Sequence, residues 1–513
     1  MAKIIIVGAG SAGCVLAARL SEDPGTEVVL LEAGGEDERR EISIPAAFSK
    51  LFRSDVDWNF ETEPQEQLGG RRIHWPRGKV LGGTSSINAM IAIPGDTADY
   101  DGWSRLGAAG WSWAEVAPIF ERVEQELALE ELRDPNPLTL RFLEAARQAG
   151  IEPSPRLAPE ALDGVRLTPV TQRRGRRRSA VDAYLRPALG RSNLRVETGA
   201  HVTRVLFAGR RAAGVELVQG GRTDRIAADE VVLAGGAVNS PQLLLLSGVG
   251  PSAELQRHGI GLVHELPGVG AHLEDHLTCG ILVASRQPWS LYAAERPLEM
   301  LRYLVSRRGM LTSNVGEAAA FVRSKPGLSA PDLEILFAPV LFEEAGLVPP
   351  SRHGFTLAAI LLEPRSSGTI RLRSADPFEP PAIEPRYLAD PEDLRALVAG
   401  VELTRRIASM PALAEVAGEE LEPGDTPLEE HVRNLAQTIY HPVGTCRMGT
   451  DDHAVVDPEL RVRGLEGLRV VDASVMPRVP HGHTHLPTLM IAERAAELIR
   501  RGAGSRPAAQ AAS

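Results

Sequence analysis

The sequence of 513 residues has little cysteine, lysine or aromatic content, and two of these shortages narrow what the protein can be. Its three cysteines cannot supply a disulfide framework, which indicates a reducing compartment, so we expect the protein to be cytoplasmic. Aromatic residues make up only 4% of the chain, with six Trp and six Tyr, so few are available to build a cage around an organic cation. The scarcity of lysine indicates a GC-rich genome rather than a function.

Long apolar runs and an excess of positive charge are also missing. No run reaches the roughly 18–20 residues that a membrane-spanning helix needs, so we expect no membrane insertion. The net charge of −11 argues against a nucleic-acid partner. The arginine-rich run at residues 173–178 lacks interleaved aromatics and is interpreted as a solvated loop. An apolar content of 43% excludes disorder of the whole chain.

The N-terminal segment predicts a strand, a glycine-rich loop, a helix and a second strand, within about 30 residues. Gly8 allows the tight turn, Gly10 lets a pyrophosphate approach the backbone, and Gly13 lets the helix pack closely on the strand. Glu32 ends the second strand, where a carboxylate can bind ribose hydroxyls and would disfavour a 2′-phosphate. This unit predicts a dinucleotide site for FAD or NAD rather than NADP.

Strand and helix patterns of the same kind recur far along the chain. Ser240 and Pro241 predict the N-cap and first turn of a helix over residues 242–247. Three further elements are predicted: a strand at residues 230–234, a strand at 468–471 that ends at Asp472, and a helix at 488–500. We therefore expect a nucleotide-binding domain built from non-contiguous pieces.

Residues 276–450 have a different pattern. Short strand-like runs at 334–337, 356–362 and 369–372 predict a mostly antiparallel sheet flanked by helices.

Four segments resemble the motifs of the glucose–methanol–choline (GMC) oxidoreductases, in the order of that family. They are residues 76–90 (PRGKVLGGTSSINAM), 235–251 (GGAVNSPQLLLLSGVGP), 441–449 (HPVGTCRMG) and 471–477 (VDASVMP). The resemblance extends over about residues 3–500. It implies a flavoprotein that oxidises an alcohol by hydride transfer to FAD.

The resemblance also implies the architecture: an α/β fold, α+β overall, with a doubly wound FAD-binding domain and a substrate domain on a mostly antiparallel sheet. We expect the FAD-binding domain to comprise residues 1–100, 190–275 and 451–503. Residues 101–189 and 276–450 are expected to form the substrate-binding cap domain. Residues 504–513 are expected to be a disordered tail.

Carried over by position, the resemblance implies these cofactor-binding residues: Gly8, Gly10, Ser11, Ala12, Gly13, Glu32, Ala33, Gly82, Gly83, Ser86, Asn88, Ala89, Met90, Val202, Asp472, Ala473, Thr484 and Pro487. The helix after Pro487 would direct its positive end at the flavin. Family members with flavin bonded to histidine can carry that histidine where this chain has Ile87. We therefore expect FAD to be bound non-covalently.

The expected catalytic residues are His441 and His483. Hydride leaves an alcohol carbon more easily when a base takes the hydroxyl proton, and histidine has a pKa near neutrality. His441 matches the active-site histidine of the family and is the expected base, while His483 is expected to bind the substrate oxygen. Tyr440 is expected to line the substrate site, because aryl-alcohol-oxidising relatives carry an aromatic residue there that stacks on the substrate.

The alternation of His481, His483 and His485 would also suit a metal site on a strand. Pro480 and Gly482 favour a loop instead, and we expect no metal. Cys446 lies beside His441 in the same motif, but a single thiol lacks a redox partner and is interpreted as packing.

The expected substrate is a primary alcohol on an aromatic or apolar carbon. Choline-dehydrogenase-like or other polar-alcohol oxidation stays open, as do a lyase or decarboxylase on the same fold, an NAD-dependent dehydrogenase and an inactive flavin-binding module. The electron acceptor is expected to be oxygen or a quinone or dye, and the protein a monomer or homodimer.

Overall fold

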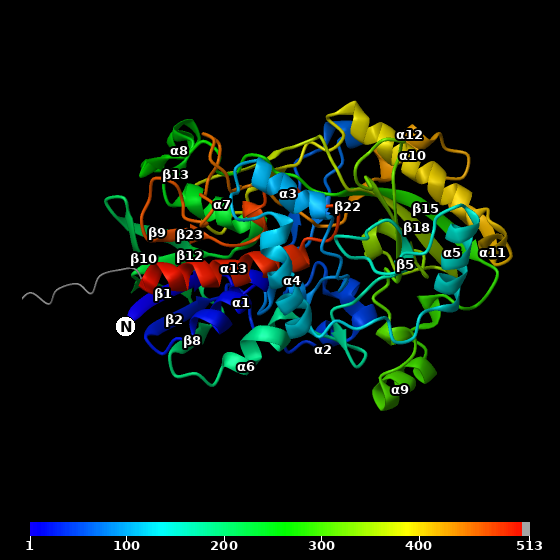
Figure 1. Ribbon diagram of the computed structural model, residues 1–513, viewed down its shortest axis with the longest axis horizontal. Coiled ribbons are helices and arrows are strands. Elements are labelled where there is room, and N and C mark those ends of the chain that lie inside the picture. Colours follow the sequence, from blue (N-terminus) through cyan, green and yellow to red (C-terminus); the bar gives the residue numbers. More distant parts are fainter. Residues whose placement is uncertain (505–513) are drawn as a thin grey trace, which may run out of the picture.

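The computed structural model describes residues 1–504, and both kinds of predicted sheet are present in it. A parallel sheet lies on one side of the molecule and a larger antiparallel sheet lies on the other (Figure 1). The predicted fold class is therefore confirmed. The expected disordered tail at 504–513 lies outside the described residues, apart from Gly504, which ends the last helix.

The parallel sheet joins segments from the start, middle and end of the chain in the order β23-β12-β1-β2-β8. Its strands are β1 (Ala2–Val7), β2 (Thr26–Leu31), β8 (Leu194–Glu197), β12 (Glu230–Leu233) and β23 (Leu468–Val470). A three-stranded antiparallel sheet, β9 (His201–Ala208), β10 (Arg211–Gln219) and β11 (Arg222–Ala227), lies beside it. Strands β1 and β2 are apolar and buried along most of their length, as expected for a parallel sheet covered on both faces.

The antiparallel sheet has seven strands and supplies the second core. They are β5 (Gly164–Leu167), β15 (Leu277–Ser285), β16 (Ala318–Val322), β17 (Leu333–Ala338), β18 (Gly354–Leu361), β21 (Ala417–Glu422) and β22 (Gln437–Thr438). The predicted strand at 369–372 is not part of it. That run forms β19 (Thr369–Arg371), which pairs with β20 (Ala382–Glu384) in a separate ribbon. Three more short pairs complete the strands: β3 (Phe60–Glu61) with β4 (His74–Trp75), β6 (Gln172–Arg173) with β7 (Arg176–Arg177), and β13 (Val249–Gly250) with β14 (His264–Glu265).

Helices flank both sheets (Figure 1). Those around the parallel sheet include α1 (Ser11–Leu20), α3 (Thr97–Arg105), α4 (Trp113–Leu127), α6 (Arg186–Ala188), α7 (Gly236–Leu246), α8 (Ser252–Arg257) and α13 (His485–Gly504). The others are α2 (Arg40–Ser43), α5 (Pro137–Gln148), α9 (Pro297–Ser306), α10 (Pro391–Ala408), α11 (Pro411–Ala414) and α12 (Leu428–Leu435). Within the described residues, no helix combines the length and the apolar character needed to cross a bilayer.

The helix predicted over 242–247 begins six residues earlier, so Ser240 is not its N-cap. Pro241 stands inside α7 and cannot donate to the carbonyl of Ala237, one turn before it. The Thr445 hydroxyl donates to that carbonyl instead, at 2.7 Å. The Ser240 hydroxyl is free to donate to Asp472 at 2.6 Å. A partner from the distant C-terminal motif thus lets the helix run through its proline.

The last helix also starts earlier than predicted, at His485 rather than residue 488. Pro487 lies in its first turn, where a missing N–H leaves no helical bond unmade. The helix therefore begins before this proline.

The division into domains stays a prediction, and the packing favours one revision of it. Tyr100, Trp103 and Phe120, from α3 and α4, belong to the same hydrophobic core as β1 and β2, and α4 packs against α13. Residues 180–188 join that core too. We therefore propose that residues 101–127 and 180–188 belong with the FAD-binding half rather than with the cap.

Candidate active site

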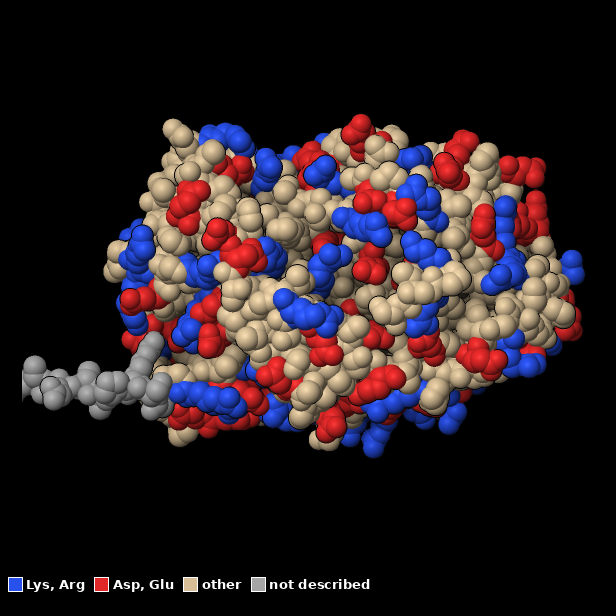
Figure 2. Space-filling model, turned by 45° about the horizontal axis from the view of Figure 1, so that its top comes forward, with Lys and Arg blue, Asp and Glu red and all other residues tan. Residues whose placement is uncertain are grey.

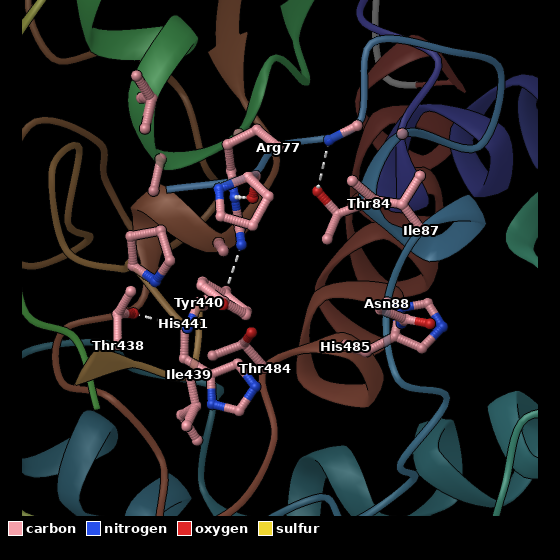
Figure 3. Close-up of a pocket in the computed structure, with 18 of the residues that line it drawn as sticks. Arg77, Thr84, Ile87, Asn88, Thr438, Ile439, Tyr440, His441, Thr484 and His485 are labelled. Carbon is pink, nitrogen blue, oxygen red and sulfur yellow. Dashed lines mark hydrogen bonds between the residues drawn. The ribbon is translucent and has the colours of Figure 1, made fainter. Parts of the chain in front are cut away.

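A cavity of about 560 Å³ lies between the two sheets. Its lining runs from the glycine loop after β1, past residues 76–91 and the start of α7, to the strands of the antiparallel sheet and the segment 437–442. Figure 3 shows Thr438 to His441 on one side of it, opposite Thr84, Ile87 and Asn88. The cavity therefore joins the two halves of the molecule.

The glycine loop closes one end of the cavity. A Cβ added to Gly13 would stand 1.9 Å from the carbonyl oxygen of Gly8, so any side chain there would collide with the loop. Gly8 itself has a φ of +100°, a conformation that favours glycine. Gly10 lies against Gly83, where its added Cβ would still be 3.9 Å from the nearest atom. Gly13 therefore shapes the loop from behind, while Gly8 and Gly10 line the cavity.

Glu32 follows β2 and reaches the same end of the cavity. Its two carboxylate oxygens accept hydrogen bonds from the backbone N–H of Ala9 and of Gly34, both at 2.8 Å. Burial raises the pKa of Glu32 to about 7, against these hydrogen bonds, which lower it. The carboxylate is thus fixed in place, and each oxygen keeps a lone pair that could bind a ribose hydroxyl.

Asp472 ends β23 and binds the start of α7. Its Oδ2 accepts from the Gly236 N–H at 2.9 Å and from the Ser240 hydroxyl, and its Oδ1 accepts from the Ser474 N–H at 2.8 Å. Burial raises the pKa of this carboxyl group. The acid predicted from the C-terminal motif therefore organises two neighbouring loops as well as lining the cavity.

Most predicted site residues lie on the cavity wall. They are Gly8, Gly10, Ser11, Ala12, Glu32, Ala33, Gly83, Asn88, Ala89, Met90, Val202, Tyr440, His441, Asp472, Ala473, His483 and Thr484. Four predicted residues do not line it: Gly13, Gly82, Ser86 and Pro487.

The residues that are absent from the wall shape the backbone behind it. The Ser86 hydroxyl donates to the Leu81 carbonyl at 2.7 Å instead of facing the cavity. Gly82 has a φ of +84°, and a Cβ there would stand 2.3 Å from Ser86 Oγ. We propose that this pair holds the turn that presents Gly83, and its expected role in binding the cofactor stays a prediction.

His485 was not among the predicted site residues, yet it lines the cavity at the start of α13. Its Nδ1 lies 3.3 Å from the Ser11 hydroxyl, and its buried Nε2 has no hydrogen-bond partner within residues 1–504. Burial lowers the pKa of this imidazole to about 4. An orphaned nitrogen beside the glycine loop fits a cavity built to receive a polar ligand such as a dinucleotide.

The two predicted catalytic histidines meet at the other end. Their rings lie edge to face, with centroids 4.8 Å apart. The backbone N–H of His441 donates to Asp275 Oδ1 at 2.7 Å, and the backbone N–H of His483 donates to the Ile93 carbonyl at 2.8 Å. These two hydrogen bonds hold the backbone of both histidines in place.

A third histidine sets the tautomer of His441. His276 Nε2 lies 3.2 Å from the carbonyl of Leu362, which can only accept, and this contact favours the tautomer with the hydrogen on Nε2. Burial lowers the pKa of His276 to about 3, which keeps the ring neutral and its Nδ1 an acceptor. His441 Nδ1, at 3.0 Å, donates to it. His441 Nε2 is left unprotonated and able to take a proton.

The pKa of His441 is itself lowered well below the usual range, first by burial and then by the nearby His483, His276 and Arg77. Arg77 donates to the carbonyl of Tyr440 at 2.6 Å (Figure 3). A neutral His441 at ordinary pH is the form that can act as a base.

His483 has its own partner in the antiparallel sheet. Its Nε2 lies 3.3 Å from Glu334, a fully buried carboxylate in β17. This contact occupies Nε2 and leaves Nδ1 for a substrate oxygen.

Sequence reasoning missed Asp275, His276 and Glu334. A signal for the first two was present, since Glu274, Asp275 and His276 are three titratable residues in succession before an apolar strand. For Glu334 the signal was a single carboxylate inside the otherwise apolar run of β17. Neither signal says which distant residue is the partner.

The alternating histidines separate rather than converge. His481 pairs with Asp99 at 2.5 Å, while His483 faces Glu334 and His485 faces Ser11. Although burial lowers the pKa of His481, Asp99 outweighs it and raises the pKa to about 9. In the described part of the chain, no three His, Cys, Asp or Glu residues are grouped to hold a metal ion.

Comparison with known proteins bears on both halves. A profile of the GMC oxidoreductase family matches residues 2–278, and a second profile of the same family matches residues 364–492. An alcohol dehydrogenase [acceptor] of Pseudomonas putida is 44% identical, covering 98% of this chain and 96% of the relative. A mitochondrial choline dehydrogenase of Homo sapiens is 42% identical, covering 97% and 89%.

A solved structure agrees with these matches. The crystal structure of pyridoxine 4-oxidase from Mesorbium loti superposes with a TM-score of 0.88 and 32% identity, over 98% of this chain and 99% of that one. The match extends over both sheets and thus over the whole cavity.

Proposed function

Because this chain belongs to the GMC oxidoreductase family, whose members bind FAD and act on alcohols, we propose that it oxidises a primary alcohol on an aromatic or apolar carbon to the aldehyde. Bound FAD would supply the hydride acceptor. The residues proposed to hold FAD are those of the glycine loop, Glu32, the 83–90 turn and Asp472. The observation that carries the proposal is the tautomer chain from Leu362 through His276 to His441.

In this proposal His441 and His483 have different roles in handling the hydroxyl group of the substrate. His441 Nε2 is the atom that takes the hydroxyl proton, because its other nitrogen is committed to His276. His483 Nδ1 positions the substrate oxygen, because Nε2 is committed to Glu334. Loss of the hydroxyl proton makes the carbon a better hydride donor.

Apolar walls near this end support an apolar substrate. Phe48, Phe52, Phe342 and Tyr440 line the cavity and pack in one hydrophobic cluster. The rings of Phe52 and Tyr440 meet edge to face at 5.5 Å. A planar alcohol would find aromatic partners there.

A second candidate substrate is choline or a similar cationic alcohol. Glu343, Glu344 and Glu422 line the same cavity, and the choline dehydrogenase relative is 42% identical. Carboxylates beside aromatic rings are the groups that recognise a quaternary ammonium.

One comparison of substrates tests both candidates. Anaerobic bleaching of the flavin by an alcohol would distinguish an oxidoreductase from a lyase or decarboxylase. We expect kcat/KM for benzyl alcohol to exceed that for choline and for glucose, and Tyr440→Ala to lower it. A choline or glucose preference of about tenfold or more, which is about 1.4 kcal/mol, would reverse the substrate assignment.

We also propose that FAD is bound without a covalent bond. Ile87 lines the cavity at the position expected for attachment and offers no nucleophile. Acid precipitation of the holoprotein should release all flavin into the supernatant, and flavin retained in the pellet would contradict this.

The electron acceptor is tested by measuring turnover with oxygen and with a quinone or dye, side by side. The oligomeric state and the cytoplasmic location stay predictions.

A further inference from the structure

Helix α9 stands apart from both sheets and projects at the lower edge of the molecule (Figure 1). It packs on the short turn Met310–Thr312. Of its ten residues Tyr303 alone is buried, with its ring under the guanidinium of Arg307.

The apolar side chains of α9 point outward. At 100° per residue, Leu298, Leu301 and Val305 fall on one face, and Met300 and Leu304 lie beside them. Their exposed fractions range from 48% to 79%. A surface helix ordinarily turns such a stripe toward the core, so α9 has the reverse orientation.

This exposure is concentrated. Among residues 1–502, thirteen large hydrophobic side chains are exposed, and six of them lie between Tyr292 and Val305. A contiguous exposed apolar surface of this kind marks a binding site.

Arginines border the apolar face. The arginine-rich run from the sequence analysis forms the β6–β7 hairpin, and its Gly175 touches the end of α9, since an added Cβ would lie 2.6 Å from the Arg307 carbonyl. Arg173, Arg174 and Arg176 on the hairpin are exposed.

Several of these charges are available for an external partner. In the described chain no carboxylate forms an ion pair with the side chains of Arg173, Arg174, Arg176 or Arg296. The nearby acids are already engaged: Glu295 with Lys50, Glu299 with Arg302, Asp134 with Arg308, and Glu130 with the backbone N–H of Arg174. A local positive surface thus stands on a protein of net charge −11.

We propose that α9 and the β6–β7 hairpin form a docking surface for an anionic lipid bilayer. The outward stripe of α9 would enter the boundary between headgroups and acyl chains, and the arginines would bind the anionic headgroups. The arginines complement the negative charge of the lipid headgroups, and the apolar stripe of α9 fits the acyl chains. A nucleic acid would offer negative charge but no apolar layer. The surface lies on the helix exterior, so docking does not depend on which alcohol the enzyme oxidises.

The face in Figure 2 provides a contrast, since acidic and basic side chains are interspersed there. An anionic bilayer would repel a molecule that is acidic as a whole, so binding requires a local surface of the opposite sign. Docking should therefore be oriented, with α9 toward the lipid.

Co-sedimentation of the holoprotein with vesicles tests the proposal. The protein should sediment with vesicles of equal parts phosphatidylcholine and phosphatidylglycerol, less in high salt, and little with phosphatidylcholine alone. The double variants Leu301→Asp/Leu304→Asp and Arg173→Glu/Arg174→Glu should each lower the partition coefficient roughly tenfold or more.

A matched control uses exposed leucines elsewhere. Leu140→Asp/Leu262→Asp changes two side chains that are 52% and 54% exposed, and it should sediment like the parent. Flavin absorbance checks that each variant is folded. Failure of the parent to bind anionic vesicles, or equal binding by the α9 variant, would overturn the proposal. A parent dimer that Leu301→Asp/Leu304→Asp converts to monomer would overturn it too, since α9 would then be a subunit contact.

Discussion

The two ends of the cavity are built in opposite ways. At the nucleotide end, Gly8, Gly13 and Glu32 come from one stretch of 25 residues. Gly13 lies against Gly8, and Glu32 binds Ala9 and Gly34, although Gly8 also lies close to Ala234. At the catalytic end, His276 meets His441 across 165 positions, and His483 meets Glu334 across 149. The glycine loop and its acid are thus built mostly within one chain segment, whereas the catalytic end exists only when both sheets are assembled.

This difference in construction affects how each end of the cavity tolerates a substitution. A local loop whose backbone atoms touch has no room for a side chain, so a substitution there acts through collision. Side chains that meet across a cavity can be shortened without collision, so a substitution there removes chemistry and leaves the fold in place. We expect the largest effects at the glycine loop and graded effects among the histidines.

The largest effect is expected for Gly13→Val. Its Cβ would lie 1.9 Å from the Gly8 carbonyl oxygen, so helix and loop must separate and FAD binding should be lost. Flavin content of the purified protein is the measurement. Gly35→Val is the control, because nothing lies within 4 Å of a Cβ there. If the Gly13→Val protein kept its flavin and its activity, the expectation that the glycine loop is the less tolerant end of the cavity would be wrong.

The next effect is expected for His441→Ala, which removes the proposed base. Anaerobic flavin reduction should slow by roughly 10²–10⁴-fold while FAD stays bound. His483→Asn should cost less, because an Asn side chain can still form a hydrogen bond with the substrate hydroxyl group. If His483→Asn abolished reduction and His441→Ala spared it, the two roles would be exchanged.

His276 is expected to act on the reaction only through His441, with which it shares a hydrogen bond. His276→Phe removes the acceptor of the His441 Nδ1 hydrogen and should slow flavin reduction roughly 10–100-fold, the range seen when an orienting partner is lost. His276→Asn keeps an acceptor oxygen and should retain most activity. The pH profile distinguishes this role from simple packing: the parent, with its depressed His441 pKa, should be flat across neutral pH. Equal losses in both variants would argue for packing.

The smallest effect concerns stability and the His481–Asp99 pair. Because the pKa of His481 is raised to about 9 in the folded protein, its stabilisation is complete below the unfolded value of about 6.5 and is lost as pH rises through 9. The Tm of the parent should therefore fall more between pH 7 and pH 10, by roughly a few degrees, than that of His481→Gln. His453→Gln, an exposed histidine, is the control and should behave like the parent.

The α/β class, the glycine loop and the four family motifs could be read from the sequence because each is contiguous. Strands β1 and β2 are short apolar runs, and their parallel pairing follows from the helix between them. His441 and Asp472 lie in these motifs, His483 lies on the loop that follows the last one, and all three line the cavity. Element starts were less certain, since α7 runs through Pro241 with help from Thr445, more than 200 positions away.

The amino-acid sequence alone determined the glycine loop, because that loop lies in one continuous segment, and the resemblance to the family singled out His441 and His483 as candidates. Only the tertiary structure decided that His276 and Glu334 are their partners. A hydrogen bond depends on distance and direction in space, and nothing in the spacing of residues 276 and 441 encodes either. The outward face of α9 is decided in the same way, because the same apolar periodicity would ordinarily predict a buried helix face.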